Sequence, residues 1–337
     1  MKGLPYQSAE PLVTVLTPVY NGEGYLAECI ESVLKQDYRH WEYIIVNNCS
    51  TDRTLEIASS YASRDPRIRI VTNPSFVGVI ENHNIAFGLI PIDSKYCKVV
   101  SADDWLAPEC LSSLVRVAEA FPSVGIVGSY QKSGDEIKWR GLSDHVEFLS
   151  GRQVVRLCSL KNLAVFGNPT SVLYRSRMVR DNAPFFPHSQ PYADISACYQ
   201  SMRNHDFGFV HEVLSTERIH ERRVSRGLEK TNVVNSAILE MFLQYGPAFL
   251  TPEEFAQEKA KKIDDFHRWL GGCLLKLSGV DFWKYQTGRL RDLGYPVKWP
   301  SVLRGALAEM IEELRNPRSA YRKMLSAVTR ALSRLGI

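Results

Sequence analysis

Short apolar runs alternate with amphipathic segments through the N-terminal part of the chain, and this alternation limits the fold more than any other feature. The apolar runs cover residues 12–16, 43–46, 68–71 and 96–100. The intervening segments have the apolar spacing of helices, which we expect at 26–34, 51–62 and 79–87. Strands that alternate with helices predict a mostly parallel, doubly wound α/β sheet.

Polar residues follow these apolar runs. Thr17 and Pro18 end the first run, Asn47 and Asn48 follow the second, and Asn73 follows the third. The carboxyl ends of parallel strands meet at one edge of a sheet, which is where such folds bind their ligands. The sequence therefore predicts a ligand crevice along that edge.

Two adjacent carboxylates, Asp103 and Asp104, follow the fourth apolar run. Paired like charges at the end of a buried strand need an opposing charge. A divalent cation would supply it, because hard cations take oxygen ligands. The alternative is that the two aspartates cap a helix that starts near Pro108, which is a common role of aspartate.

Three motifs carry a resemblance to a known family. They are L-V-T-V-L-T-P-V-Y-N-G-E-G-Y-L, E-Y-I-I-V-N-N-C-S-T-D and S-A-D-D-W-L-A-P. In this order they make the chain resemble the family 2 glycosyltransferases of the GT-A fold. The resemblance is close over residues 11–130 and looser at 167–171 and 218–225. It implies an α/β fold in which helices flank a doubly wound, mostly parallel sheet, with a helical C-terminal appendage.

The resemblance also implies an activity. Such enzymes move a sugar from a nucleotide-sugar donor to an acceptor hydroxyl by single displacement with inversion, usually with Mg²⁺ or Mn²⁺. The acceptor would be a saccharide or a lipid-linked molecule, in polysaccharide or glycolipid synthesis.

The resemblance assigns the donor site to residues after the strands and to a later loop. The donor-binding residues would be Pro18, Tyr20, Asn21, Asn47, Asn48, Asn73, Gly78, His83, Asn84, Ser101, Ala102, Asp103, His220, Arg223 and Ser225. The metal would rest on Asp103, Asp104 or both. Tyr20 would stack on the base, and the last three residues belong to a loop that closes over the donor phosphates, which arginine suits.

The chain departs from the family pattern at three places. Asn47 and Asn48 stand where the family usually has two aspartates, so the usual preference for uridine does not carry over, although an amide both donates and accepts hydrogen bonds. Ser101 replaces the first aspartate of the Asp-x-Asp motif. His83 stands where the family often has arginine, and a neutral imidazole would hold a diphosphate less firmly. Ordinary surface and core packing is the alternative for Tyr20 and His83.

The transfer needs a base that takes the proton of the acceptor hydroxyl. Asp194 is the best candidate, because it follows a proline-containing loop and opens a helix-like stretch at 195–202. The family's base occupies a similar place. The alternative, which is compatible with the first, is that Asp194 caps that helix. Weaker candidates, expected to be solvated, are Asp181, Asp206 and Glu221.

Two other functions stay open. A nucleotidyltransferase would also use a strand-end carboxylate, but it would want a glycine- and basic-rich loop after the first strand, and residues 17–25 contain no Lys or Arg. The other is a non-catalytic nucleotide-sugar binder, which is considered because Asn47, Asn48 and Ser101 replace aspartates of the family pattern. Nucleic-acid binding is not expected, since the aromatic residues of the basic tail are not interleaved with its basic ones.

The C-terminal part has a different pattern. We expect it to be mostly helical, which divides the chain into a catalytic domain at 1–230 and a helical region at 231–337. Residues 301–337 carry the whole formal net charge of +4. Their apolar stripe consists of Tyr321, Met324, Leu325, Val328, Leu332 and Leu335. A basic amphipathic helix at 318–337 can lie on an anionic membrane surface. More often such a helix packs against its own domain or against a second subunit of a homo-oligomer, and both alternatives stay open.

The composition agrees with a globular enzyme. Hydrophobic residues make up 45% of the 337 residues, enough for one large domain with an appendage. The seven cysteines have no paired spacing, so we expect buried, reduced thiols. No apolar run reaches ~18 residues, and the N-terminus lacks the apolar stretch of a signal peptide. We therefore expect a cytoplasmic protein, at the inner membrane face if the membrane alternative holds.

Overall fold

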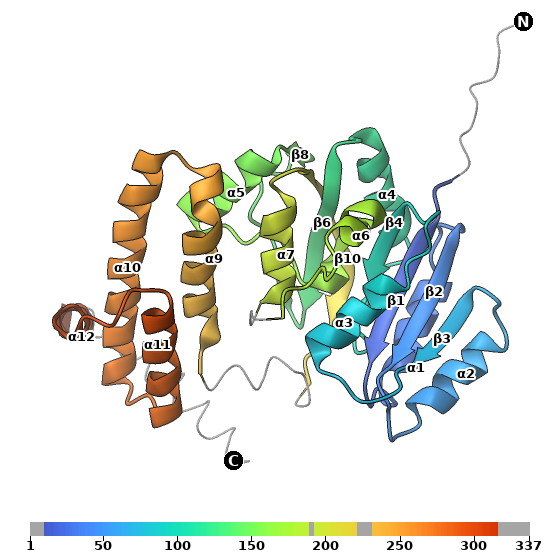
Figure 1. The fold of residues 1–337 in the computed structure, drawn as a ribbon, viewed down its shortest axis with the longest axis horizontal. Coiled ribbons are helices and arrows are strands. Elements are labelled where there is room, and N and C mark those ends of the chain that lie inside the picture. Colours follow the sequence, from blue (N-terminus) through green and yellow to red (C-terminus); the bar gives the residue numbers. More distant parts are fainter. Residues whose placement is uncertain (1–9, 189–191, 221–230, 316–337) are drawn as a thin grey trace, which may run out of the picture. The chain divides into compact units, whose positions relative to one another are not determined.

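The computed structural model describes residues 10–188, 192–220 and 231–315 (Figure 1). Its internal contacts separate two compact units. The first comprises residues 1–223 and 248–250, and the second comprises 224–247 and 251–337. The functional division at residue 230 remains a prediction.

The first unit is built on one mixed sheet with strand order β3-β2-β1-β4-β9-β6-β10-β5. Strands β1 to β4 are mutually parallel as predicted, and β10 is parallel to β6. The antiparallel strand β9 lies between β4 and β6. The strands are β1 Val13–Val19, β2 Trp41–Asn47, β3 Ile68–Thr72, β4 Tyr96–Val99, β5 Trp105–Leu106, β6 Val124–Ser133, β9 Val172–Arg175 and β10 Asp206–Glu217, with short β7 Glu136–Lys138 and β8 Phe148–Leu149.

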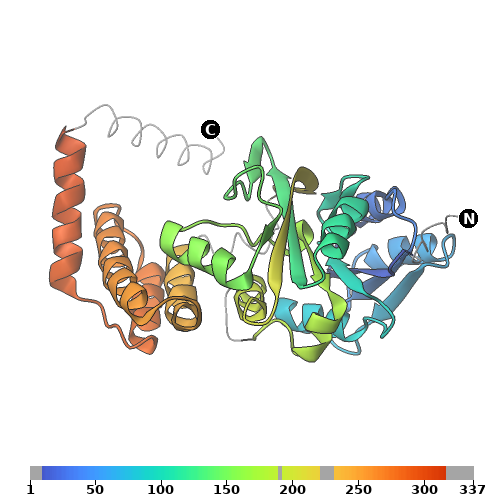
Figure 2. The same ribbon diagram turned by 90° about the horizontal axis from the view of Figure 1, so that it is seen from above.

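Helices cover both faces of this sheet (Figure 2). They are α1 Leu26–Leu34, α2 Thr54–Ala62, α3 Val79–Gly88, α4 Cys110–Ala120, α5 Gly151–Lys161, α6 Ser176–Asp181 and α7 Ala193–Ser201. Apolar residues of α1, α2 and α4 share one core with Val13 and Val15 of β1. On the opposite face Phe87 of α3 packs edge-on against Tyr174 of β9 and Phe185. The architecture is therefore the expected α/β sheet flanked by helices.

The first strand is longer than predicted, since it continues through Thr17 and Pro18 to Val19. Pro18 pairs with Val46 of β2, whereas β4 pairs only with residues 13–16 of β1. The backbone N–H of Val100 donates to the carbonyl oxygen of Leu16, so the backbone polar groups of Leu16 face β4. Residues two apart in a strand face the same way, so the missing N–H of Pro18 also faces that side, past the end of β4. A proline is tolerated there because no ladder bond is lost.

The second unit is helical. It contains most of α9 Val233–Phe249, together with α10 Pro252–Leu275, α11 Val280–Asp292 and α12 Trp299–Arg315. Its core gathers around Phe266 and Leu270 of α10, Phe282 and Leu290 of α11, and Val302 of α12. Among the described residues, no helix has the length and apolar content that a membrane crossing requires.

All seven cysteines are free thiols. Six are buried, and Cys49 is half-buried. The expectation of buried, reduced cysteines is therefore correct for the six buried ones.

Candidate functional site

The loops after β1 and β2 are tied together at the carboxyl edge of the sheet. The backbone N–H of Asn21 donates to the Ser50 hydroxyl at 3.0 Å, and the Asn21 side-chain oxygen accepts from the N–H of Thr51 at 2.8 Å. Tyr20 is 49% exposed beside them, in edge contact with Phe76 at a centroid distance of 4.8 Å. Tyr20 therefore lies on the surface rather than in the core, and its exposed ring is available for stacking.

The asparagines after β2 and β3 are buried, and their amides are engaged. Asn48 donates to the carbonyl oxygen of Val77 at 2.8 Å and accepts from its N–H at 3.0 Å. Asn73 donates to the side-chain oxygens of Asn48 and Asn82. Asn47 accepts from the N–H of Ser50 at 3.1 Å. Asn48 and Asn73 thus fix the loop before α3, and Asn47 fixes the turn after β2. A direct contact of these three asparagines with a nucleoside remains a prediction.

Helix α3 begins after Gly78, its N-cap, and presents His83 and Asn84. His83 bonds through Nδ1 to the carbonyl oxygen of Val79 and stacks on Phe186 at 5.5 Å. Burial lowers the pKa of His83, so its imidazole is neutral at pH 7. Asn84 both donates to and accepts from the backbone of Phe186 at 2.8 and 2.9 Å. Both residues therefore hold Phe186 against α3, and their contacts with a donor remain predictions.

Below the aspartate pair lies a buried support that the sequence did not reveal. The N–H of Ser101 donates to the Thr170 hydroxyl oxygen at 3.1 Å, and that hydroxyl donates to the Ser101 hydroxyl at 3.2 Å. Lys98 of β4 is fully buried and donates to the carbonyl oxygens of Thr170 and Val172. Burial lowers the pKa of Lys98 to about 8. These bonds fix the backbone at Ser101, next to Ala102 and Asp103.

Asp103 and His220 meet at the carboxyl edge of the sheet, although 117 positions separate them. Nε2 of His220 lies 2.8 Å from Oδ2 of Asp103. The His220 ring packs on Tyr25 at 4.7 Å, and its buried Nδ1 has no hydrogen-bond partner in the described part of the chain. Asp104 is 4% exposed, and burial together with the charge of Asp103 raises its pKa to about 7. The structure thus brings together residues from two of the family motifs.

The capping alternative for Asp103 and Asp104 is wrong. Helix α4 starts at Cys110, its N-cap is Glu109, and it has no side-chain cap. The aspartates instead lie in the turn before β5, where the N–H of Asp104 donates to the carbonyl oxygen of Ser101 at 2.9 Å. Their carboxylates are therefore not used by a helix.

Arg218 holds the end of β10 against the aspartate pair. Its N–H donates to Oδ1 of Asp104 at 3.2 Å, and its Nε donates to the carbonyl oxygen of Asp103 at 3.3 Å. Its guanidinium also pairs with Glu28 of α1 and lies 4.9 and 4.8 Å from the rings of Tyr25 and Trp105. His220 follows two residues later, so Arg218 places it beside Asp103. The only sequence signal for this role was that Arg218 opens the motif R-I-H.

The side chains here are of the kinds that would hold a divalent cation together with a diphosphate. Asp103 supplies a carboxylate, His220 an imidazole and Asp104 a second carboxylate on the adjacent residue. Within the described ranges, no three acidic, His or Cys side chains converge closely enough to form a complete cage. Mg²⁺ commonly takes one or two carboxylates, substrate phosphate oxygens and water rather than such a cage.

Asp194 is the second residue of α7 and is half-buried. Burial raises the pKa of its carboxyl to about 6. The N-cap of α7 is Tyr192, so the alternative that Asp194 caps the helix is wrong. Hydrogen bonds from the backbone N–H groups of Ile195 and Asp194 itself oppose part of that rise in pKa. A carboxyl whose pKa lies near 6 suits proton transfer near neutral pH.

The weaker base candidates have other surroundings. Asp206 accepts from the N–H of Gly151 at 3.0 Å. Asp181 is exposed at the end of α6 and pairs with Arg177 at 3.4 Å. The predictions for Glu221, Arg223 and Ser225 lie outside the described residues, as does the tail at 318–337.

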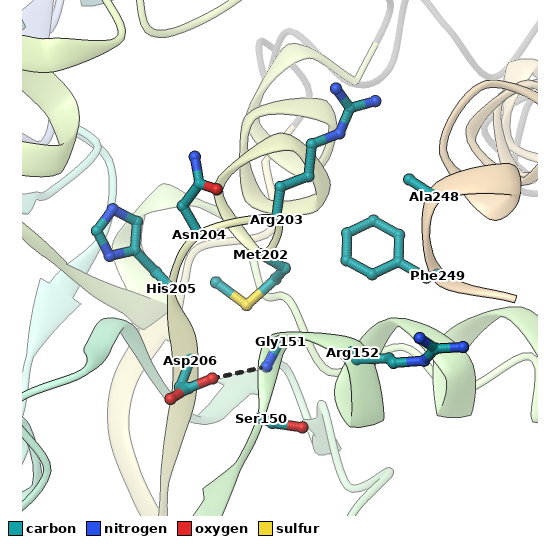
Figure 3. Close-up of a pocket in the computed structure, with 10 residues that line it drawn as sticks. All are labelled: Ser150, Gly151, Arg152, Met202, Arg203, Asn204, His205, Asp206, Ala248 and Phe249. Carbon is teal, nitrogen blue, oxygen red and sulfur yellow. Dashed lines mark hydrogen bonds between the residues drawn. The ribbon is translucent and has the colours of Figure 1, made fainter.

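Figure 3 shows a pocket of the first unit lined by residues 150–152, 202–206 and 248–249. Asp206, which bonds to Gly151 there, is the first residue of β10. Strand β9 runs antiparallel to both β4 and β6, so β6 has the same direction as β4, and β10 is parallel to β6. The start of β10, and with it this pocket, therefore lies at the amino edge of the parallel strands. It is therefore separate from Asp103 and His220, which lie at the carboxyl edge.

A family model described as glycosyl transferase family 2 matches residues 14–182. The chain belongs to this family. The match begins in β1 and ends just after α6, so it contains the aspartate pair, whereas Asp194 and His220 lie beyond it.

Similar proteins agree with this family. An uncharacterized glycosyltransferase of Haemophilus influenzae is 29% identical over 202 residues, which are 55% of this chain and 58% of the relative. The chain thus spans little more than half the length of that relative. The putative glycosyltransferase EpsH of Bacillus subtilis is 24% identical over 261 residues, which are 76% of this chain and 74% of EpsH.

Solved structures share the fold. The structure of S. aureus TarS 1–349 in complex with UDP-GlcNAc has a TM-score of 0.62 and 18% identity, covering 84% of this chain and 80% of that one. The mannosyltransferase PcManGT from Pyrobaculum calidifontis, in complex with GDP-Man and Mn²⁺, has a TM-score of 0.55 and 15% identity over 93% and 90% of the two chains. At these identities the likeness shows the fold alone.

Replacing Arg218 with methionine should weaken the aspartate site. We expect Arg218→Met to lower the free energy of unfolding by ~1.5–3 kcal/mol, because charge-assisted hydrogen bonds are lost. Since His220 is then no longer held beside Asp103, Mn²⁺ affinity should fall ~10-fold or more. Isothermal titration with Mn²⁺ alone measures this, with exposed Arg177→Met as the matched control. An Arg218→Met protein with wild-type Mn²⁺ affinity would refute the positioning role.

Proposed function

We propose that this chain transfers a sugar from a nucleoside-diphosphate donor to an acceptor hydroxyl, by single displacement with inversion at the anomeric carbon. The observation that carries the proposal is the contact between Asp103 and His220 at 2.8 Å. It joins the strand-end aspartates to a distant motif at the sheet edge where α/β folds bind nucleotides. Family membership supplies the reaction class.

In this reaction Asp194 is the base. Its carboxylate takes the proton of the acceptor hydroxyl while that oxygen bonds to the anomeric carbon, and the bond from that carbon to the diphosphate oxygen breaks. Asp194 does not itself bond to the anomeric carbon, so the reaction is a single displacement that inverts the configuration at that carbon.

Asp103, with Asp104 and His220, would hold Mg²⁺ or Mn²⁺. When bound, such an ion offsets the negative charge that develops on the leaving diphosphate. The neutral imidazole of His83 adds no charge there. Tyr20, exposed beside the loops after β1 and β2, would stack on the base of the donor.

The proposed acceptor is a saccharide or lipid-linked molecule, in polysaccharide or glycolipid synthesis. Neither the nucleotide nor the sugar is assigned, because Asn47 and Asn48 replace the usual aspartates. The two solved structures bind UDP-GlcNAc and GDP-Man respectively, so the shared fold accommodates either base.

Hydrolysis of a panel of nucleotide sugars with Mn²⁺ tests this function. The proposal expects slow release of the nucleoside diphosphate and free sugar from at least one donor. A nucleotidyltransferase would instead release pyrophosphate from nucleoside triphosphates. A non-catalytic binder would bind a donor but neither hydrolyse it nor transfer its sugar to any acceptor. Release of pyrophosphate, or binding without turnover, would contradict the proposal.

The rate of transfer should depend on the ionisation of Asp194. Its pKa of about 6 means that the carboxyl is mostly protonated at pH 5 and ionised at pH 7. Only the ionised form is a base, so the rate at saturating donor should rise about tenfold per pH unit below pH 6 and level off above it. A pH–rate profile from pH 4.5 to 8 measures this. A rate that is flat between pH 5 and 7 would contradict the assignment.

A further inference from the structure

Helix α12 presents an apolar face to solvent. Trp299, Leu303, Leu307, Met310 and Leu314 are between 48% and 79% exposed. Their spacing of four, four, three and four residues places all five on one stripe of the helix. We call these five residues the α12 stripe.

The stripe is not the main face that α12 uses against its own unit, although Trp299 at its start contacts Trp283 of α11 at a ring-centroid distance of 5.6 Å. That face consists of Val302, Gly305 and Ala306, which meet α10. A Cβ added at Gly271 of α10 would lie 2.4 Å from the nitrogen of Ala306 and 2.5 Å from the oxygen of Val302, so the two helices cross at close range. Small residues therefore make the contact with α10, while the four stripe residues after Trp299 are exposed.

We infer that residues 318–337 of the same chain cover the α12 stripe as an antiparallel helix. This segment carries Tyr321, Leu325, Val328, Leu332 and Leu335 at spacings of four, three, four and three residues. The α12 stripe repeats four, three and four from Leu303 onward. Two helices whose apolar residues recur at this average of 3.5 residues pack side by side along their whole length.

The length and position of the segment fit this arrangement. It follows α12 directly, and Asn316 and Pro317 interrupt helical continuation. Antiparallel helices are commonly joined by two to five residues, so this dipeptide is long enough for the turn. As a helix, residues 318–337 would measure ~30 Å against ~25 Å for α12, at 1.5 Å per residue.

Physical arguments favour this occupant over two others. The 3.5-residue repeat within the α12 stripe runs only from Leu303 to Leu314, which is less than two heptads, whereas coiled coils between separate chains are typically sustained over three or four. A segment of the same chain has an effective concentration in the millimolar range and needs no such length. An anionic membrane is disfavoured on α12 itself, because residues 309–313 include three glutamates. The basic side chains within residues 318–334 carry the charge opposite to these glutamates, which favours pairing of the two segments.

Hydrogen exchange of the full-length protein tests the inference. Leu325→Asp with Leu332→Asp places two charges in the apolar stripe of the tail, and this pair should accelerate exchange of residues 299–315 about tenfold or more. Ser326→Asp with Ser333→Asp adds the same charges to the opposite side of that helix and should leave the exchange unchanged. Peptides from the α10 core around Leu270 report whether the unit itself stays folded.

Three results would overturn the inference. One is equal exchange of residues 299–315 in the wild type and both variants. Another is protection that is lost on dilution, together with a dimer in sedimentation, because a second copy would then cover the stripe. The third is protection that appears only with phosphatidylglycerol vesicles, which would assign the tail to a membrane surface.

Discussion

Asp194→Asn is expected to lower the rate of sugar transfer by ~10²-fold or more, while the affinity for the donor stays nearly unchanged. The substitution keeps the shape of the side chain and removes its basicity. Because burial holds the pKa of Asp194 at about 6, its ionisation costs stability above that pH. The cost is absent below the unfolded pKa near 4 and grows as the pH rises toward 6. The variant should therefore be at least as stable as the wild type at pH 7.

The matched control is Asp206→Asn, because Asp206 bonds to Gly151 at the other edge of the sheet. It should keep the wild-type transfer rate. Transfer assays with the donor at saturation, together with thermal unfolding at pH 5 and pH 7, measure both variants. An Asp194→Asn protein that binds the donor poorly yet turns over normally at saturation would make Asp194 a binding residue instead.

If Asp103 holds the proposed metal, Asp103→Ala should abolish most of the activity. A bound cation contributes several kcal/mol to the stabilisation of the leaving group, so a loss of ~10²-fold or more is expected. Asp104→Ala should have a similar effect. Removing the charge of Asp103 also lowers the pKa of Asp104, since that charge is one of the causes that raise it. Transfer rates with Mn²⁺ and with EDTA measure the requirement.

The control for these variants is a circular dichroism spectrum and melting curve, which should match those of the wild type within a few degrees. Exposed Asp181→Ala controls for the loss of a carboxylate as such. Full activity in EDTA, or a wild-type rate in both aspartate variants, would remove the metal from the account.

The parallel half of the fold could be predicted because its signals are local. Apolar runs of four or five residues and helical spacing identify β1 to β4 and the helices between them. The position of β9 between β4 and β6 could not be predicted, because this pairing joins segments far apart in the chain. Which strands pair at long range depends on tertiary packing rather than on local propensity.

The candidate site was predicted in its residues but not in its contacts. The sequence named Asp103 and His220 separately, and only the folded chain shows that they lie 2.8 Å apart. Arg218 and Thr170 fell only within the looser parts of the resemblance, and Lys98 had no signal beyond its residue type. Their roles depend on partners at least 69 positions away along the chain. The caps proposed for the aspartates were wrong, because a cap depends on where a helix begins to within one residue.

The most direct test of the central claim is a crystal structure of the protein with Mn²⁺ and the nucleoside diphosphate of its best donor. The account predicts Mn²⁺ coordinated by the Asp103 carboxylate and the diphosphate. It also predicts His220 within contact distance of the ion and the nucleobase of the donor beside Tyr20. A nucleotide bound elsewhere, such as in the pocket at residues 150–152 and 202–206, or a diphosphate held without a metal at Asp103, would contradict it.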